Sequence, residues 1–355
     1  MFFENLLEKA SIKIATVRAM LQTNDRLRAI VFGKHSLNKD PLQENNDFLK
    51  LAQEFPGEIE WKIYDHCATV MRLYAIYERF VEDLISEWLQ LLPELISSYS
   101  DLGETIQNTH REGIGRLLTY PKKIRFEDTE NQNLSIYYKK VFQGFLAAIS
   151  DNEKYELLPE IFIFHEQNLR KDALVELLTK AGIEKGWEWI IDHRQIKYFI
   201  EQVRGNQNTT EAELKQFIHY RNKAAHGSIN ETLGIKELLY LADFVEALCQ
   251  ALAELVTYQI LLKKVSIGQA QNVGRVTEWF KKPKAAVVRV ENITLSVGDK
   301  LFLVNEESSY CSLAKIESIE IDDRSENQVK ISSITEVGLK FNIDARKGFS
   351  LYVIN

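Results

Sequence analysis

The amino-acid sequence predicts a mainly α-helical protein that ends in a small all-β barrel. Up to about residue 270, apolar residues recur at steps of three and four, which is the period of a buried helix face. After about residue 272 the pattern changes to short alternating runs rich in Val and Ile, separated by turn-forming residues. We therefore expect a helical domain over residues 1–270, with its core at about 60–265, and a barrel over residues 273–355.

Two segments carry the strongest helical signal. Residues 70–92 hold one broad apolar stripe, made of Leu73, Ile76, Tyr77, Phe80, Val81, Leu84, Ile85, Trp88 and Leu89, and Pro93 follows it. Residues 234–264 are apolar on more than one side, which indicates a central helix. Shorter helices are expected near residues 2–22, 134–149, 170–181 and 211–226. Residues 100–133 are polar and predict a loop.

The strand-like part begins with residues 285–323 and continues with residues 330–355. Alternating Val and Ile are broken there by Gly-Asp and Asn-Glu-Glu-Ser turns. This pattern predicts five to seven short strands, about the size of a small barrel.

Composition restricts the class of protein. Hydrophobic residues make up 45% of the 355 residues, so a sizeable core is available. The net charge of −7 argues against a protein held to nucleic acid by bulk charge, but it is compatible with an RNA enzyme that has a local basic groove.

The cysteines and the start of the chain bear on its compartment. Cys67, Cys249 and Cys311 are far apart, odd in number and without CxxC spacing, so neither a disulfide framework nor a zinc site is indicated. The first residues lack the pattern of a signal peptide, and no stretch reaches membrane-spanning length without charges. We expect a cytoplasmic protein without a membrane segment, metal ion or cofactor.

The stretch "FIHYRNKAAHG", residues 217–227, places an arginine and a histidine around four residues. Five residues advance an ideal helix by about 500°, so Arg221 and His226 would point about 140° apart. They can converge only if the helix deforms near its end, or if a second chain supplies the facing residues.

Two interpretations of this pair stay open at this point. Arginine and histidine in the last turn of a helix interact well with its dipole and its free carbonyls, and Gly227 is a natural helix-end signal. In the other interpretation the two side chains are half of an active site. Asn222, next to the arginine, then orients it or contacts phosphate; otherwise it is an exposed helix residue.

"RNKAAHG" resembles the signature of the HEPN superfamily. Two further stretches, "LYAIYERFVEDL" and "FHEQNLRKDALVELLTKAGI", precede it in the expected order. They are similar to one of two HEPN branches, the MAE-like helical nucleases or the RiboL-PSP-HEPN proteins. The resemblance covers roughly residues 60–265 and implies a HEPN-type helical bundle.

The resemblance also implies a function. Active members are metal-independent endoribonucleases in which two motifs face each other across a homodimer, so Arg221, His226 and Asn222 become the catalytic candidates. The expected substrate is RNA such as tRNA, in a toxin or antiphage-defence setting with an antitoxin or defence-system partner. The alternative is a catalytically silent HEPN scaffold or regulatory subunit that binds RNA or a partner protein.

The residue types suit this chemistry. RNA carries its own nucleophile, the 2′-hydroxyl. Histidine, with a pKa near neutrality, can act as acid or base. Arginine stays charged, and its fork matches two phosphate oxygens.

Further residues are candidates for supporting roles. Glu78 lies in the "YERF" stretch, either near the active-site helix or simply at the rim of the apolar stripe. Asn168 and Arg170 are expected to organise the loop into the next helix rather than to touch substrate. Candidate RNA-binding residues are Lys122, Lys123, Arg125, Lys281, Lys282 and Lys284. The last three stand beside two aromatic residues and suit single-stranded RNA, although a solvated linker is the commoner meaning of such a run.

The C-terminal segment carries a second resemblance. "LSVGDKLFLV", "AKIESIEID", "EVGLKF" and "GFSLYVI" are similar to the β-barrel of translation proteins, the second domain of elongation factor Tu, and to the barrel that ends some U32-type peptidases. Such barrels often contact tRNA or ribosomes, but many are only folding modules.

Overall fold

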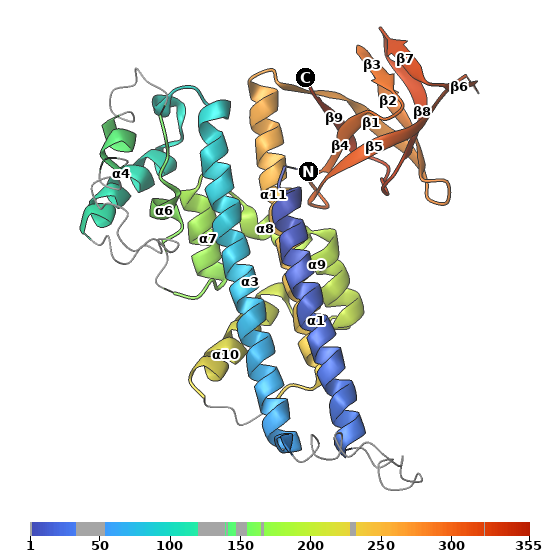
Figure 1. Ribbon diagram of the computed structural model, residues 1–355. Helices are drawn as coiled ribbons and strands as arrows, with labels where there is room; N and C mark the ends of the chain where they lie inside the picture. The colour runs from blue at the N-terminus through green and yellow to red at the C-terminus, as the bar shows by residue number, and fades with distance from the viewer. Residues whose placement is uncertain are drawn as a thin grey trace.

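The computed structural model describes residues 2–32, 54–119, 139, 141–146, 155–164, 167–227, 232–322 and 324–355. Helices come first along the chain and strands follow (Figure 1). The helices are α1 (Glu4–Phe32), α3 (Glu58–Leu95), α4 (Glu104–Thr119), α6 (Pro159–Phe162), α7 (Lys171–Lys180), α8 (Gly186–Asp192), α9 (Arg194–Tyr198), α10 (Thr210–Ala225) and α11 (Ile235–Ser266), with a 3₁₀ turn η2 (Tyr99–Asp101) and a π-helical turn η4 (Phe199–Val203).

Three long helices, α1, α3 and α11, lie side by side and form the body of the helical part (Figure 1). All nine residues of the predicted stripe on α3 are buried. Helix α11 is buried on several sides, which confirms its predicted central place. Helix α3 begins earlier than the stripe and runs through Pro93 to Leu95. A proline so near the C-terminal end disturbs little more than the last turn.

The loop predicted over residues 100–133 is wrong for Glu104–Thr119, which form helix α4. Its buried face is Ile106, His110 and Ile114, at steps of four. The polar histidine in the middle hid this face from the sequence pattern. Residues 120–133 lie outside the described part, and of the helix expected at 134–149 only residues 139 and 141–146 are described, as helix.

The strands form a closed antiparallel barrel. They are β1 (Ala270–Phe280), β2 (Ala285–Val290), β3 (Ile293–Ser296), β4 (Lys300–Asn305), β5 (Tyr310–Ile321), β6 (Arg324–Glu326), β7 (Gln328–Ile331), β8 (Thr335–Phe341) and β9 (Ser350–Ile354). Six of them follow the order β4-β9-β1-β2-β8-β5, and pairing of β4 with β5 closes the ring. Strand β6 extends β5, while β3 and β7 pair separately, so the described part has more strands than the five to seven predicted.

The barrel packs on one end of the helical bundle, beside the start of α1 and the end of α11 (Figure 1). Phe302, Val304 and Cys311 of the barrel belong to the same apolar core as the helices. The rings of Phe2 and Phe302 are stacked with centroids 5.5 Å apart. No described helix has the length and apolarity needed to cross a membrane.

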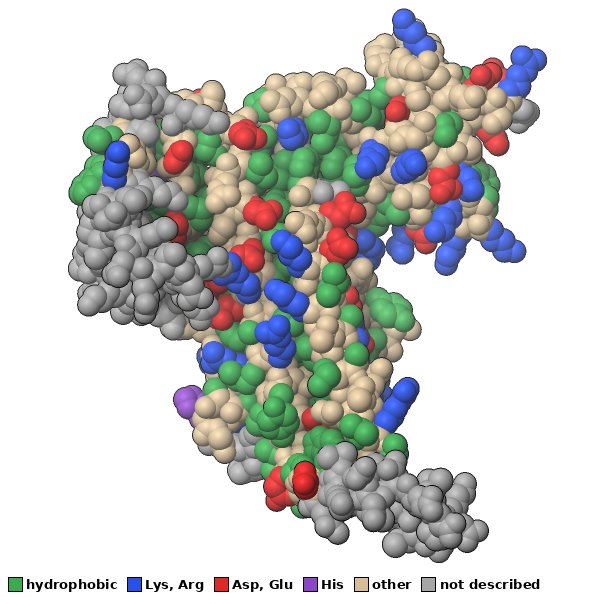
Figure 2. Space-filling view, in the orientation of Figure 1, with side chains coloured by type: hydrophobic (Ala, Val, Ile, Leu, Met, Phe, Trp, Pro, Cys, Tyr) green, Lys and Arg blue, Asp and Glu red, His purple; other side chains and the backbone are tan. Residues whose placement is uncertain are grey.

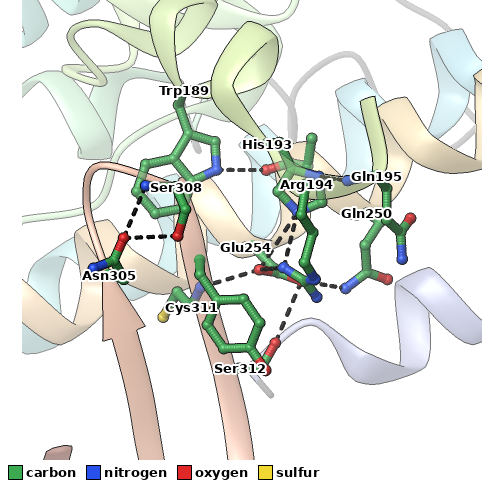
Figure 3. A network of polar contacts seen from close by, with 12 residues as sticks. Trp189, His193, Arg194, Gln195, Gln250, Glu254, Asn305, Ser308, Cys311 and Ser312 are labelled. Carbon is green, nitrogen blue, oxygen red and sulfur yellow. Dashed lines mark hydrogen bonds and ion pairs between the residues drawn. The ribbon is translucent and has the colours of Figure 1, made fainter. Parts of the chain in front are cut away.

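A buried carboxylate also joins the two parts (Figure 3). Glu254 of α11 has no exposed surface, and it accepts two hydrogen bonds from Arg194, at 2.7 and 2.6 Å, and one from the backbone N–H of Cys311, at 3.0 Å. His193 Nδ1 accepts from the N–H of Gln195, so its Nε2 carries the proton and faces Glu254 at 3.4 Å. Burial alone would raise the pKa of Glu254, but the bonds from His193 and Arg194 outweigh it and lower that pKa to about 2.

Candidate active site on helix α10

Helix α10, which carries the motif, has clear signals at both ends. The side chain of Thr209 caps its start by accepting from the N–H of Ala212, at 3.2 Å. At its other end the N–H of His226 still bonds the carbonyl of Asn222, at 3.1 Å. Gly227 follows with φ 68°, a left-handed conformation that glycine adopts without strain. The motif therefore lies on the last regular turn and the cap.

The buried face of α10 consists of Leu214, Phe217 and Ile218, and the helix packs against α3. This contact places Arg221 over Tyr74 of α3, with its guanidinium carbon 4.7 Å from the ring centre. Such cation–π stacking holds the plane of the guanidinium group.

Arg221 has no carboxylate within ion-pair distance among the described residues. It differs in this from the ion-paired arginines of the helical part, which are Arg18, Arg28, Arg79, Arg194 and Arg204. Its Nη1 donates to Asn222 Oδ1 at 3.2 Å, while its buried Nε has no hydrogen-bond partner in the described part. The charge of Arg221 is therefore positioned but not neutralised.

Asn222 is half-buried and organises its neighbours. Its Oδ1 also accepts from Nδ2 of Asn168, at 2.8 Å. Asn168, expected only to order a loop, thus connects that loop to the motif. Asn222 borders a hollow of about 400 Å³, whose other lining residues include Arg170, Lys215 and His219. This hollow gives the motif an open, basic approach.

Tyr74 is the residue on which this arrangement rests, and the sequence analysis missed it. Its hydroxyl accepts from the N–H of Leu169, at 3.1 Å, and donates to Glu78 Oε1, at 2.9 Å. Burial raises the pKa of Tyr74, so the phenol stays neutral and can donate. Glu78 therefore contacts the phenol that lies under Arg221. The signal in the sequence was the spacing of four between a tyrosine and a glutamate on one helix face.

His226 lies at the surface. Its side chain is exposed and has no hydrogen bond or ion pair within the described residues. Helix α10 is regular through Ala225, so it does not bend to bring His226 onto Arg221. One chain by itself thus presents an arginine and a histidine on the same helix end without joining them.

The predicted RNA-binding lysines of the barrel lie elsewhere. Lys281, Lys282 and Lys284 are exposed in the turn between β1 and β2, at the opposite end of the molecule from α10 (Figure 1). Lys122, Lys123 and Arg125 lie outside the described residues. In the part of the chain that the structure describes, no group of three His, Cys, Asp or Glu side chains is arranged to hold a metal ion.

Comparison with known proteins adds one family. The family described as RiboL-PSP-HEPN matches residues 36–258, well over half of the chain. A search of curated proteins finds no match. Among solved structures, the C-terminal domain of a putative U32 peptidase from Geobacillus thermoleovorans, as its selenomethionine variant, is 17% identical. That similarity covers 23% of this chain and 96% of the other, with a TM-score of 0.21, and is too low to assign a role to the barrel.

Proposed function

Because the chain belongs to the RiboL-PSP-HEPN family, we propose that it is an endoribonuclease that cleaves RNA without a metal ion. The observation that carries this proposal is the state of Arg221. Its guanidinium group is stacked on Tyr74 and bonded to Asn222, yet no described carboxylate neutralises it. A positioned arginine without an ion-pair partner suits the phosphate of a bound RNA strand.

The reaction follows from the groups present. The 2′-oxygen of RNA loses its proton to a base and forms a bond to the adjacent phosphorus. The bond from phosphorus to the 5′-oxygen breaks, and that oxygen takes a proton from an acid. His226 serves as base or acid, and two chains together supply one of each. Arg221 stabilises the charge on the equatorial phosphate oxygens.

Asn222 and Glu78 act as positioning residues in this proposal. Asn222 Oδ1 fixes one N–H of Arg221, which directs the remaining N–H groups toward the phosphate. Glu78 fixes the hydroxyl of Tyr74, and with it the ring on which the arginine lies.

The site is proposed to be complete only in a homodimer, because the regular end of α10 keeps Arg221 and His226 apart in one chain. Closed twofold dimers are the common solution for such a composite site. Light scattering of the purified protein at micromolar concentration is therefore expected to give twice the mass of the chain. A monomer that cleaves RNA would contradict the composite site.

The chemistry of the products tests the mechanism. Cleavage should persist in EDTA and leave a 2′,3′-cyclic phosphate on one product and a 5′-hydroxyl on the other, as read by mass spectrometry. The matched control is the same RNA with a single 2′-deoxy nucleotide at the cut position, which should resist. Products with 5′-phosphates, or loss of cleavage in EDTA, would point to metal-activated water instead.

The family resemblance supports a biological setting for this activity. We propose a toxin or antiphage effector that acts on tRNA or another structured RNA with an exposed single-stranded loop, where bases can be unstacked. Absence of any cleavage by the intact dimer would favour the rival function, a silent HEPN scaffold that binds RNA or a partner protein.

A further inference from the structure

A second basic hollow lies where the barrel meets the start of α1. Its volume is about 840 Å³, twice that of the hollow beside Asn222. The cations that line it are Arg194, Lys281, Lys284, Lys300, Lys315 and Arg346, and the carboxylates are Glu4 and Asp344. Figure 2 shows Lys and Arg side chains gathered on this side of the barrel. The whole chain is acidic, with a net charge of −7, so this local excess of cations is not a general property of the surface.

Two of these cations already have partners. Arg194 is held by the buried Glu254, and Lys284 lies 3.9 Å from Asp344. The others have no ion pair within the described residues: Lys281, Lys300, Lys315 and Arg346. Four exposed positive charges around one hollow repel each other, and they are available to an anion.

The pairing of β4 with β5 places two of these lysines opposite each other. Lys300 of β4 and Lys315 of β5 are direct partners across the two strands, and both line the hollow. Like charges directly opposite each other on a sheet are destabilising. An acidic residue at either position would have stabilised the same barrel. A bound phosphate group between the two ammonium groups would turn their repulsion into attraction.

Aromatic residues line the same hollow. Trp279 is half-buried in its wall, and Tyr310 and Phe349 lie deeper, with ring centroids 4.6 Å apart. Arg194 covers Tyr310, at 4.2 Å from its ring centre. Phosphate-binding cations next to an aromatic wall are the combination that binds single-stranded nucleic acid, where bases stack and the backbone meets positive charge.

We propose that this hollow binds a single-stranded segment of RNA, with its phosphates at Lys300, Lys315, Lys281 and Arg346 and a base against Trp279. The barrel strands and the start of α1, which line the hollow, lie far from α10 (Figure 1), so the hollow would hold a part of the RNA remote from the cleaved bond. The proposed function is used here only to identify the nucleic acid as RNA. The size of the hollow, and the spread of its cations around it, favour a strand over a single small anion.

Binding is measured by fluorescence anisotropy with a labelled single-stranded RNA of about eight nucleotides. The protein is the full chain with Arg221→Ala and His226→Ala, so that neither cleavage nor the arginine of α10 contributes. Adding Lys300→Gln and Lys315→Gln should weaken binding at least about tenfold and make the salt dependence shallower, by about 0.7 in slope per lost contact.

Lys330→Gln is the matched control, because Lys330 is an exposed lysine of β7 that does not line the hollow. Its affinity should stay within about twofold of the parent. An equal loss in this control would show attraction to charge alone and overturn the proposal. An unchanged affinity in the double variant would overturn it as well.

Two further measurements separate the alternatives. Without RNA, Lys300→Gln should unfold at the same temperature as the parent or a higher one, because it relieves repulsion; a lower temperature would mark a structural lysine and overturn the assignment. Adenosine monophosphate should compete poorly with the labelled RNA. If it competes as strongly as unlabelled RNA does, the ligand of the hollow is a free nucleotide and the proposal of an RNA strand is overturned. All these results concern binding, so failure of the cleavage proposal would not alter them.

Discussion

Replacing His226 with alanine is expected to lower RNA cleavage roughly 10²-fold or more, the usual scale for losing general acid–base catalysis. The imidazole is exposed and forms no side-chain hydrogen bond in the described part, so its removal should leave the fold intact. The measurement is kcat/KM on a defined stem-loop RNA, with the unfolding temperature and the dimer mass recorded for the same preparation. His226→Asn keeps a polar side chain but cannot transfer protons, so it should be equally inactive.

Arg221 is expected to be as sensitive, for a different reason. Arg221→Ala removes the group that holds charge on the phosphate, and a similar loss should follow. Arg221→Lys keeps the charge but should rescue poorly. Lysine has no planar group to stack on Tyr74, and its single ammonium group cannot bond Asn222 and also present a two-pronged donor to the phosphate.

His219→Ala provides a comparison on the same helix. His219 is exposed and borders the hollow beside Asn222. Its loss should change KM without changing kcat, because His219 is expected to contact the bound RNA away from the bond that is cleaved. If His226→Ala behaves in that way as well, or keeps full activity, the motif is no more than a well-capped helix end and other residues carry the cleavage.

The parts of the fold that could be predicted are those with an uninterrupted period. Helix α3 shows this best, because one stripe of apolar residues predicted its buried face in full. The change of period after residue 272 likewise predicted the β part. Helix α4 was missed because its buried face includes His110, whose pKa burial lowers to about 4, so that it packs as a neutral group although the sequence marks it as polar.

Only the part of the candidate site that lies on helix α10 could be predicted from the sequence. Arg221, Asn222 and His226 are neighbours in the sequence, and their residue types were enough to single them out. Tyr74 and Asn168 come from other elements, and their contacts with Arg221 and Asn222 depend on how α10 packs on α3. No local pattern encodes that packing.

The same limit applies to the barrel. Lys281 and Lys284 were visible as a basic run, but the run alone did not separate them from Lys282. Lys300 and Lys315 face each other only because β4 and β5 pair in one register. A residue-by-residue interpretation of the sequence contains neither the register nor the closure of the ring.

Glu254 is a fully buried charged residue whose replacement should destabilise the fold. This glutamate of the apolar segment "ALAELVTYQI" was not singled out in the sequence analysis, and its partner Arg194 is far away in the sequence. It also accepts from Gln250, at 2.7 Å, and from Ser312 of the barrel, at 3.4 Å (Figure 3). One buried carboxylate thus satisfies donors from both parts of the molecule.

The pKa of Glu254 gives the sign of its contribution to stability. A value of about 2, against an ordinary 4.5, means that folding favours the ionised form. The ionised group therefore stabilises the fold fully above pH 4.5, and this contribution is lost as the pH falls from 4.5 toward 2. By the usual conversion the contribution to the free energy of unfolding is about 3 kcal/mol.

Glu254→Gln should accordingly lower the free energy of unfolding at neutral pH by about 3 kcal/mol or more, because Arg194 then loses its buried counter-charge and an amide N–H₂ faces donors. Urea unfolding at neutral pH measures this loss. The control is Glu246→Gln on the same helix, whose ion pair with Arg18, at 2.8 Å, is partly exposed and should contribute no more than about 1 kcal/mol.

A second measurement follows the unfolding temperature from about pH 5 to about pH 3. The parent should lose stability more steeply than Glu254→Gln in that range, since only the parent has the carboxylate to protonate. Equal slopes and a loss no larger than in the control would mean that the joint between α11 and the barrel is held by Phe302, Val304 and the other apolar contacts alone.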